Sequence, residues 1–449
     1  MTEGSPVEDE ARPDEDPWSF VPPVPMTIRE TGIAEGFLRE LVLKALWVYD
    51  KPTLVTLSEV IGLHSTVVSE LVESLKREGL CEVDSQEAGQ SIHFRFRPTE
   101  RGKAAAHEAL DRSRYVGMAP VPVGAYNEVV AQQVKRYRRP PLEDIRGALE
   151  HMVLPDYLVE ELGQAFFSRR ALMVYGPSGN GKTEIVTSIA KIVAGTIVIP
   201  YALYGHGQLI HVFDPDVHHP KESGSSPSDG IMADTPSRHD RRWLPVDRPT
   251  VMVGGNMGEE ALEMTFDPVQ GIHKAPLSVI AQGGVLIIDD LGRQKVSPRD
   301  ILNRWVIMME QGYDSFALST SEIVRLPLDV TLIFSTNLTL HDLMDEAYLR
   351  RIAYKIAIPD PDPSQIAQIA QRFCDSKGIK WSDDMIQYLI ERLFAPGLPK
   401  PRGCYPRDII TTIIDQAEFH GREPALDRES IHAACRMYFG TAEVESQAA

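Results

Sequence analysis

The glycine-rich stretch GPSGNGKTE has residue types and spacing suited to binding phosphate groups. Gly176, Gly181, Lys182 and Thr183 match the pattern G-x-x-x-x-G-K-[ST], between an apolar run that predicts a strand and a predicted helix. Glycines let backbone N–H groups turn towards phosphates, the helix N-terminus adds its dipole, lysine bridges the β and γ oxygens and threonine binds Mg²⁺. We therefore predict an ATP-binding loop made of Gly176, Pro177, Ser178, Gly179, Asn180, Gly181, Lys182, Thr183 and Glu184.

Two adjacent carboxylates, Asp289 and Asp290, end the apolar run GVLII. The simplest interpretation of this pair is a turn, because aspartate is common in turns. If the run is a buried parallel strand beside the first one, its carboxyl end lies at the ligand-binding edge of the sheet. We then expect Thr183 and Asp289 to bind Mg²⁺, directly or through water, and Asp290 to polarise an attacking water. A cation close by would make the two like charges tolerable.

Further polar residues stand next to later predicted strands and helices. The apolar run TLIFSTN ends in Asn337, DEAYLRRIAYKIAI places Arg350 and Arg351 just before another strand, and CYPRDI opens a helix with Arg407. Together with the glycine-rich loop and the acidic strand, this succession resembles the AAA+ ATPase family across residues 150–440. The segment ILNRWVIMMEQGYDSFALSTSEIVRLPLDVTLIFSTN is also similar to MoxR-type members of that family.

The resemblance implies an α/β fold, with a doubly wound parallel P-loop sheet followed by a C-terminal helical lid. It implies that Asn337 helps to orient the lytic water and that Arg407 reaches the γ-phosphate from the lid. Arg351 looks like an arginine finger that completes the site of a neighbouring subunit, with Arg350 as the close alternative. A surface ion pair is the alternative for each arginine. A finger supplied from outside requires a neighbour, so the resemblance implies a ring or spiral homo-oligomer, often a hexamer.

The sequence departs from the family pattern in two places. Asp290 stands where the family has glutamate and is one methylene shorter, so turnover would be slow or the water would approach differently. After TIVIPYAL, which we take as the second strand of the sheet, residues 204–276 form an unusually long insert. The pore-facing loop that grips a substrate in the family comes from this region; we identify no aromatic-hydrophobic-Gly motif there, and Tyr204-Gly205 is a candidate that matches it in part.

The insert contains His206, His211, His218, His219 and His239. Their spacing fits no standard metal site, so we expect a mobile polar loop rather than a metal centre. The four cysteines, Cys81, Cys374, Cys404 and Cys435, form no C-x-x-C pair, which favours buried thiols in a reducing cytosol.

Residues 29–115 predict three helices, a hairpin around QEAGQ and a fourth helix. This order, and the ending PTERG, resemble the winged helix of MarR-like regulators. The module carries 12 Lys and Arg against 14 Asp and Glu, and its third helix contains three glutamates. Phosphate binding needs uncompensated cations, and only the wing offers them, at Arg95, Arg97, Arg101 and Lys103. The balance slightly favours a protein-docking module over a DNA-binding one.

The chain of 449 residues is long enough for several domains and carries a net charge of −18. The sequence shows neither a long apolar run nor a secretory signal, so we expect a cytoplasmic protein with no membrane contact. We predict a disordered acidic and Pro-rich tail (1–28), the winged helix (29–115), a linker with the basic cluster KRYRRPP (116–149), the α/β core (150–360), the lid (361–440) and a tail (441–449).

These features predict an ATPase that uses Mg²⁺ and remodels a protein partner. The alternatives that remain are a DNA-associated loader or transcription regulator that uses the winged helix, and a slow nucleotide-dependent assembly switch.

Overall fold

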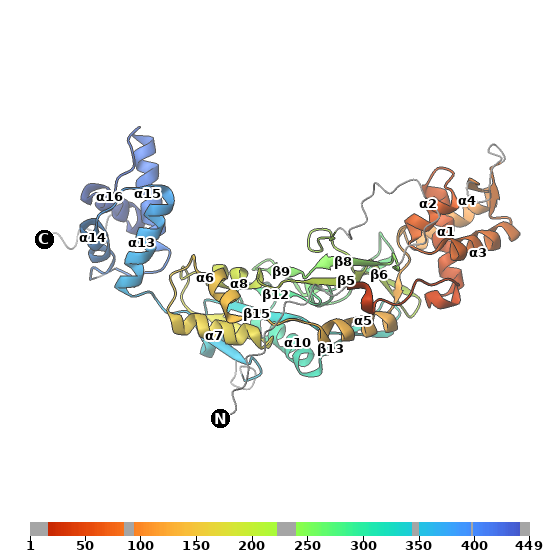
Figure 1. The fold of residues 1–449 in the computed structure, drawn as a ribbon, viewed down its shortest axis with the longest axis horizontal. Coiled ribbons are helices and arrows are strands. Elements are labelled where there is room, and N and C mark those ends of the chain that lie inside the picture. The colour runs from red at the N-terminus through yellow and green to blue at the C-terminus, as the bar shows by residue number, and fades with distance from the viewer. Residues whose placement is uncertain (1–16, 85–93, 222–238, 344–349, 397, 441–449) are drawn as a thin grey trace, which may run out of the picture.

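The computed structural model describes residues 17–84, 94–221, 239–343, 350–396 and 398–440. Our expectations for the acidic tail up to residue 16, for the tip of the QEAGQ hairpin, for most of the polar loop in the insert and for the tail 441–449 lie outside these residues. Figure 1 shows an elongated molecule, with a helical region at each end and β-sheets between them.

The central sheet is fully parallel and carries the site. Its strands lie side by side in the order β16 (Tyr354–Ala357), β4 (Leu172–Tyr175), β15 (Thr331–Thr336), β12 (Val285–Ile288) and β9 (Thr250–Val253). All four residues of β12 are buried, as an apolar run inside a covered parallel sheet should be. Because the strands are parallel, their carboxyl ends meet at one edge, where Gly176, Asp289 and Asn337 follow directly.

Helices cover both faces of this sheet. One face is covered by α6 (Leu142–Leu149), α7 (Asp156–Phe167) and α8 (Lys182–Ala190), and Leu172 and Val174 of β4 pack against these helices. Met173, which points the opposite way, joins the other face, covered mainly by α10 (Pro298–Gln311). Ser297 caps α10 by accepting the backbone N–H of Asp300, with proline in the first turn. Two short helices, α9 (Leu277–Ile280) and α11 (Leu340–Leu343), complete this region.

A second β-region lies beside the central sheet and corrects our prediction for the second strand. Residues Thr196–Pro200 form β5, which pairs antiparallel with β8 (Trp243–Asp247) outside the central sheet. The strand that neighbours β12 is β9 instead, from within the expected insert. The rest of the insert contributes to a mixed sheet in the order β10 (Thr265–Asp267), β11 (Ile272–Lys274), β7 (Gln208–His211), β6 (Ala202–Gly205) and β3 (Val121–Pro122). A hairpin, β13 (Tyr313–Ala317) and β14 (Ile323–Pro327), follows α10.

The expected linker is also structured, which differs from our prediction. Residues 116–149 contain β3, α5 (Val123–Lys135) and α6, and Tyr126, Val129 and Val130 of α5 are buried in the core of the second β-region. Residues 17–28, expected to be part of the tail, include the 3₁₀ turn η1 (Pro17–Phe20), and Trp18 packs against the same core. The prediction was based on the prolines and charged residues of this segment and did not consider the helical spacing of the apolar residues in α5.

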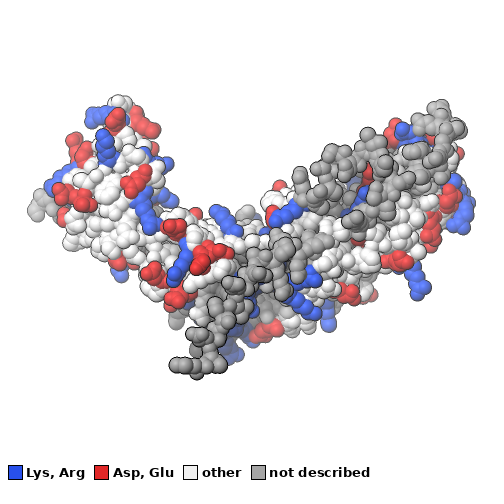
Figure 2. Space-filling model, in the orientation of Figure 1, with Lys and Arg blue, Asp and Glu red and all other residues white. Residues whose placement is uncertain are grey.

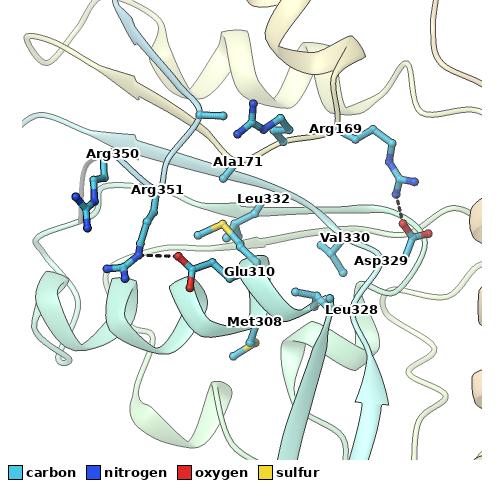
Figure 3. A pocket seen from close by; sticks show the side chains of 14 residues that line it. Arg169, Ala171, Met308, Glu310, Leu328, Asp329, Val330, Leu332, Arg350 and Arg351 are labelled. Atoms are coloured by element: carbon cyan, nitrogen blue, oxygen red, sulfur yellow. Dashed lines mark hydrogen bonds and ion pairs between the residues drawn. The ribbon is translucent and has the colours of Figure 1, made fainter. Parts of the chain in front are cut away.

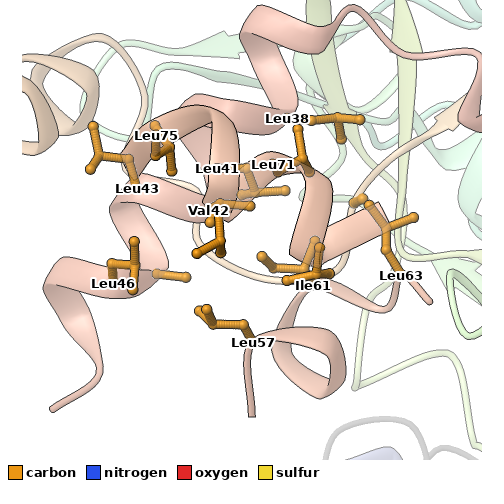
Figure 4. Packing of buried hydrophobic residues seen from close by; sticks show 14 of the residues in the cluster. Leu38, Leu41, Val42, Leu43, Leu46, Leu57, Ile61, Leu63, Leu71 and Leu75 are labelled. Carbon is orange, nitrogen blue, oxygen red and sulfur yellow. The ribbon is translucent and has the colours of Figure 1, made fainter. Parts of the chain in front are cut away.

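The N-terminal module packs three helices around one apolar core (Figure 4). They are α1 (Glu35–Val48), α2 (Leu54–Ile61) and α3 (Ser65–Arg77), followed by a short antiparallel pair, β1 (Cys81–Val83) and β2 (Phe96–Pro98), and by α4 (Glu100–Arg112). The turn η2 (Arg29–Thr31) precedes them. Arg242 of the insert, only 4% exposed, binds Asp240 at 2.8 Å and donates to the carbonyls of Thr31 and Pro120. The module is therefore fastened to the insert rather than tethered loosely.

The C-terminal region is helical, with α13 (Pro363–Lys377), α14 (Asp383–Leu393), α15 (Tyr405–Phe419) and α16 (Arg428–Phe439) around one core. Asp362 and Gln365 form a complete capping box at the start of α13. The predicted fold class, an α/β parallel sheet with a helical C-terminal region and a helical N-terminal module, is confirmed. Among the described residues no single helix could cross a bilayer; α2 and α3 pass the length and composition test only as a pair bent by 111°.

Candidate functional site

The glycine-rich loop joins β4 to α8 at the carboxyl edge of the central sheet. Gly176, Gly179 and Gly181 have φ angles of 142°, 85° and 79°, which side-chain-bearing residues rarely adopt. A Cβ atom at Gly176 would lie 2.3 Å from the carbonyl oxygen of Ile358, and one at Gly179 would lie 2.8 Å from Sγ of Cys404. The loop thus needs glycine both for its conformation and for the close approach of its neighbours.

Lys182, the first residue of α8, lies folded back onto the loop. Its Nζ donates to the carbonyl oxygens of Gly176 at 2.9 Å and Pro177 at 2.8 Å, and to Oδ1 of Asn337 at 2.6 Å. Burial lowers the pKa of Lys182, and the carboxylates of Asp290 and Asp289 oppose this effect. A cation held only by neutral acceptors is available to move to a phosphate oxygen, where it would gain a charged partner.

Thr183 and Asp289 come together as the magnesium prediction requires. Oγ1 of Thr183 donates to Oδ2 of Asp289 at 2.9 Å. The Asp289 side chain is 9% exposed, and its other oxygen, Oδ1, is buried without a hydrogen-bond partner among the described residues. A buried carboxylate oxygen without a partner, beside a hydroxyl, fits the oxygen ligands that Mg²⁺ prefers. These residues therefore fit the predicted ion.

Asp290 and Asn337 face each other from the ends of β12 and β15. Nδ2 of Asn337 donates to Oδ1 of Asp290 at 2.8 Å, so Asn337 links Asp290 to Lys182. Arg293 approaches the other oxygen of Asp290 at 3.6 Å. The φ angle of Asp290 is +51°, a left-handed conformation in which aspartate and asparagine are enriched over other residues that bear a side chain. The carboxylate pair is thus both a turn and part of a polar cluster.

Arg350 and Arg351 lie at the opposite edge of the sheet. They precede β16, which runs parallel to β4 with Tyr354 opposite Leu172, whereas the glycine-rich loop follows β4. The four residues of β4, roughly 13 Å of strand, therefore separate these arginines from the loop of the same chain. Nε of Arg351 pairs with Oε1 of Glu310 at 2.8 Å. Neither arginine is positioned to act on its own chain's loop.

Arg407 does not join the cluster at the glycine-rich loop. Its side chain is 61% exposed, and its guanidinium pairs with the adjacent Asp408 at 2.9 Å. The residue that does approach is Arg402, which pairs with Asp360. Sequence reasoning missed Arg402, although it lies in the segment that we expected to deliver Arg407, LFAPGLPKPRGCYPRD. That stretch offers two arginines, and only the tertiary structure distinguishes them.

The loop before α15 docks directly on the glycine-rich loop. The backbone N–H of Cys404 donates to the carbonyl oxygen of Gly179 at 2.9 Å, and that of Gly403 donates to Oδ1 of Asn180 at 3.0 Å. Nδ2 of Asn180 in turn donates to Oδ1 of Asp360 at 2.9 Å. These hydrogen bonds connect the segment before α15, Asp360 and the glycine-rich loop.

The other predicted site residues lie nearby or elsewhere. Ser178 is exposed on the loop, and Glu184 on α8 approaches His151 at 3.2 Å. Tyr204 lies on β6 and packs against Phe37 of the N-terminal module, so this Tyr-Gly pair is part of a sheet rather than a free loop. Among the described side chains no group of three or more His, Cys, Asp and Glu could hold a metal ion. His218 is buried with both ring nitrogens hydrogen-bonded.

A family model described as a domain of unknown function, DUF8689, matches residues 362–437, the C-terminal helical region. A comparison with curated protein sequences found no match.

Several solved structures are partly similar to the chain. NtrX from Brucella abortus in complex with ATP shares 14% identity over 78% of this chain and 67% of that chain, with a TM-score of 0.36. The RuvB Holliday junction branch migration motor from Thermotoga maritima shares 10% identity over 63% and 69% of the two chains, with a TM-score of 0.36. Domain III of the Thermotoga maritima replication initiation protein DnaA shares 11% identity over 65% and 96%, also with a TM-score of 0.36. At these scores the likeness assigns neither a ligand nor an activity to this chain.

Proposed function

We propose that the chain binds ATP with Mg²⁺ at the carboxyl edge of the central sheet and hydrolyses it. One observation carries the proposal: two hydrogen-bonded groups, Lys182–Asn337–Asp290 and Thr183–Asp289, lie side by side next to the glycine-rich loop. Together they have the cation, the hydroxyl, the carboxylates and the amide that phosphoryl transfer to water requires.

In this account the backbone N–H groups of the loop and the N-terminus of α8 hold the phosphate groups. Lys182 leaves the carbonyls of Gly176 and Pro177 for the β and γ oxygens. Thr183 and Asp289 would hold Mg²⁺, and the ion would supply positive charge beside the phosphate groups. Loss of the Lys182 contact frees the carbonyl of Asn337 to orient water.

Asp290 then accepts the proton of the attacking water. Its carboxylate lies 2.8 Å from the Asn337 amide, so the same asparagine positions both the water and the residue that polarises it. A slow nucleotide-dependent switch is the second candidate, favoured by the shorter side chain of Asp290 and by its contacts with Asn337 and Arg293.

The arginine positions support a site shared between copies of the chain. Arg350 and Arg351 lie at the edge opposite their own loop, so only a neighbouring copy can bring ATP to them. We therefore propose a ring or spiral homo-oligomer, with six copies as the expected size, in which Arg351, or Arg350 beside it, contacts the neighbour's γ-phosphate. We propose that Arg402, rather than the predicted Arg407, approaches the phosphate groups bound to its own chain.

A protein partner fits the N-terminal module better than DNA does. The wing arginine Arg97 pairs with Glu82 at 2.9 Å, and Lys103 pairs with Glu100 at 2.7 Å, so these cations are already compensated. Glu70 and Glu73 are exposed on α3. Figure 2 shows both charge signs interspersed over the face in view, including the N-terminal end at the right. We propose that this winged-helix-like module docks a protein that ATP turnover remodels, with duplex DNA binding as the alternative.

The primary experiment measures ATP binding and phosphate release by the full chain with Mg²⁺. We expect Lys182→Ala to weaken ATP binding at least about tenfold and to abolish turnover, because the charge-assisted contacts to phosphate are lost. Lys191→Ala, a lysine on the same helix's C-terminal end, is the matched control and should behave as the unmodified chain. Equal ATP affinity in the Lys182→Ala and Lys191→Ala variants would contradict the proposed site.

A further inference from the structure

A cavity of about 540 Å³ opens at the amino-terminal edge of the central sheet, opposite the ATP edge. Its floor is apolar, with Ala171, Met308 and Leu332 from three elements, and its rim is rich in arginine (Figure 3). The arginines of the rim are Arg169, Arg170, Arg350 and Arg351. In a chain with a net charge of −18, four arginines around one cavity are a marked local excess of positive charge.

Two of these arginines are already paired, and two are not. Arg169 binds Asp329 at 2.8 Å and Arg351 binds Glu310 at 2.8 Å, which accounts for both acidic residues of the lining. Arg170 and Arg350 are exposed and form no ion pair within the described part of the chain. The cavity therefore offers two guanidinium groups without an ion-pair partner among the described residues, each able to bind a carboxylate through two hydrogen bonds.

The described chain begins close to this edge. Ser19, in η1, accepts a hydrogen bond from Arg136 at the end of α5. The next residue, Tyr137, stacks on the guanidinium of Arg169, with 3.7 Å between the guanidinium carbon and the ring centroid. Arg169 lines the cavity itself. Two contacts, through the adjacent residues Arg136 and Tyr137, thus connect η1 to the arginine rim.

The sixteen residues that precede η1 have the complementary charge. MTEGSPVEDEARPDED contains seven acidic residues and one arginine. Sixteen residues of extended chain span up to roughly 50 Å, so the segment easily reaches the cavity from η1. We propose that the acidic segment 1–16 docks in this cavity, with its carboxylates on Arg170 and Arg350.

The docking has a consequence for the other side of the rim. A segment bound there lies next to Arg351 and so covers the surface that a neighbouring copy must reach. The segment would then restrain assembly until it is displaced. This consequence rests on the proposed shared ATP site, whereas the docking itself requires no nucleotide.

The test is a binding measurement without nucleotide. A fluorescently labelled peptide of residues 1–16 is titrated with the full chain and with a chain that begins at residue 17, and anisotropy is recorded at low and at physiological ionic strength. We expect the shortened chain to bind the peptide at least about fivefold more tightly than the full chain, whose own segment competes. We expect this binding to weaken with added salt, since it joins exposed charges.

Two controls make the site specific. In the shortened chain, Arg170→Ala with Arg350→Ala should weaken peptide binding at least about fivefold. Arg101→Ala, an exposed arginine on the distant N-terminal module, should leave it unchanged. A peptide with all seven acids replaced by their amides should not bind. Equal affinity of the full and shortened chains, or equal affinity of the Arg170/Arg350 and Arg101 variants, would overturn the proposal, whatever the ATPase activity.

Discussion

At the scale of single residues, the backbone conformation of residue 290 explains why this position holds an aspartate, whereas the family resemblance predicts a glutamate. Its φ angle of +51° places it in the left-handed region, where aspartate and asparagine are better tolerated than longer side chains. The turn after β12 therefore selects the shorter acid, and Asn337 holds it in place at 2.8 Å. The backbone conformation of this turn and the proposed activation of water therefore both depend on Asp290.

Replacing Asp290 with asparagine or with glutamate tests its backbone role and its chemical role separately. We expect Asp290→Asn to keep the free energy of unfolding within about 0.5 kcal/mol and to keep ATP binding, because asparagine suits the same backbone. Turnover should fall at least about a hundredfold, since the proton acceptor is lost. Asp290→Glu is the matched variant that retains the carboxylate and should cost about 1 kcal/mol of stability. Unchanged phosphate release in Asp290→Asn would show that another residue activates the water.

At the scale of elements, the loop between α14 and α15 links the helical region to the carboxyl edge of the central sheet, where we propose that ATP binds. The segment Arg402–Cys404 contacts Asp360 and the glycine-rich loop directly. Burial has the largest effect on the pKa of Lys182 and lowers it, whereas the carboxylates of Asp290 and Asp289 raise it. The charge of Arg402 has a smaller effect, which also lowers this pKa. Arg407 is one turn further and faces solvent. The position of the loop, rather than the arginine pattern, decides which arginine lies near the glycine-rich loop.

We therefore expect Arg402→Ala to weaken ATP binding at least about fivefold, because a cation within electrostatic range of the phosphates is removed. Arg407→Ala is the matched control and should change affinity less than about twofold. Titration calorimetry of both variants with an ATP analogue measures the difference. A larger loss in Arg407→Ala would restore the role that the family resemblance implies for that residue.

Lys44 of α1 makes the stability of the N-terminal module depend on pH. Its Nζ is buried and donates to the carbonyl of Ser113 at 3.0 Å, and burial lowers the pKa of Lys44 to about 8, opposed by Glu40. Between pH 8 and the ordinary lysine pKa of 10.5, the unfolded chain holds a proton that the folded chain has released. This contribution to the free energy of unfolding therefore rises with pH across that window.

Lys44→Met should remove the rise. Urea unfolding of both chains at several pH values between 7.5 and 10.5, followed by a signal from the N-terminal module, gives the difference between them. Taking the difference cancels the titration of tyrosines and cysteines common to both. A difference that stays constant across the window would mean that Lys44 keeps its proton in the folded state.

The parts that the sequence predicted are those encoded locally. The glycine-rich loop, the Asp289 and Asp290 pair and Asn337 each follow an apolar run, and the parallel arrangement of those runs is enough to bring them together. Arg402, β9 and α5 were missed because their places depend on contacts between distant segments. Nothing in the sequence of residues 250–253 indicates that they, rather than residues 196–200, form the strand beside β12.

At the scale of the whole molecule, the two edges of the central sheet have different roles. The carboxyl edge gathers the proposed ATP site and the docking loop of the helical region. The amino edge carries Arg350, Arg351 and the arginine-lined cavity. The N-terminal module is joined to the insert through the buried hydrogen bonds of Arg242.

The central claim is that one copy's ATP site is completed by the next copy's arginine, and mixing two inactive variants tests it most directly. Lys182→Ala is expected to bind ATP weakly and not to hydrolyse it but retains Arg350 and Arg351, whereas the double variant Arg350→Ala and Arg351→Ala retains the ATP site. Each alone should release almost no phosphate from ATP. Their mixture should recover a substantial fraction of the unmodified rate, because an intact loop meets an intact arginine between unlike copies. A mixture no faster than the sum of the two separate variants would contradict the claim.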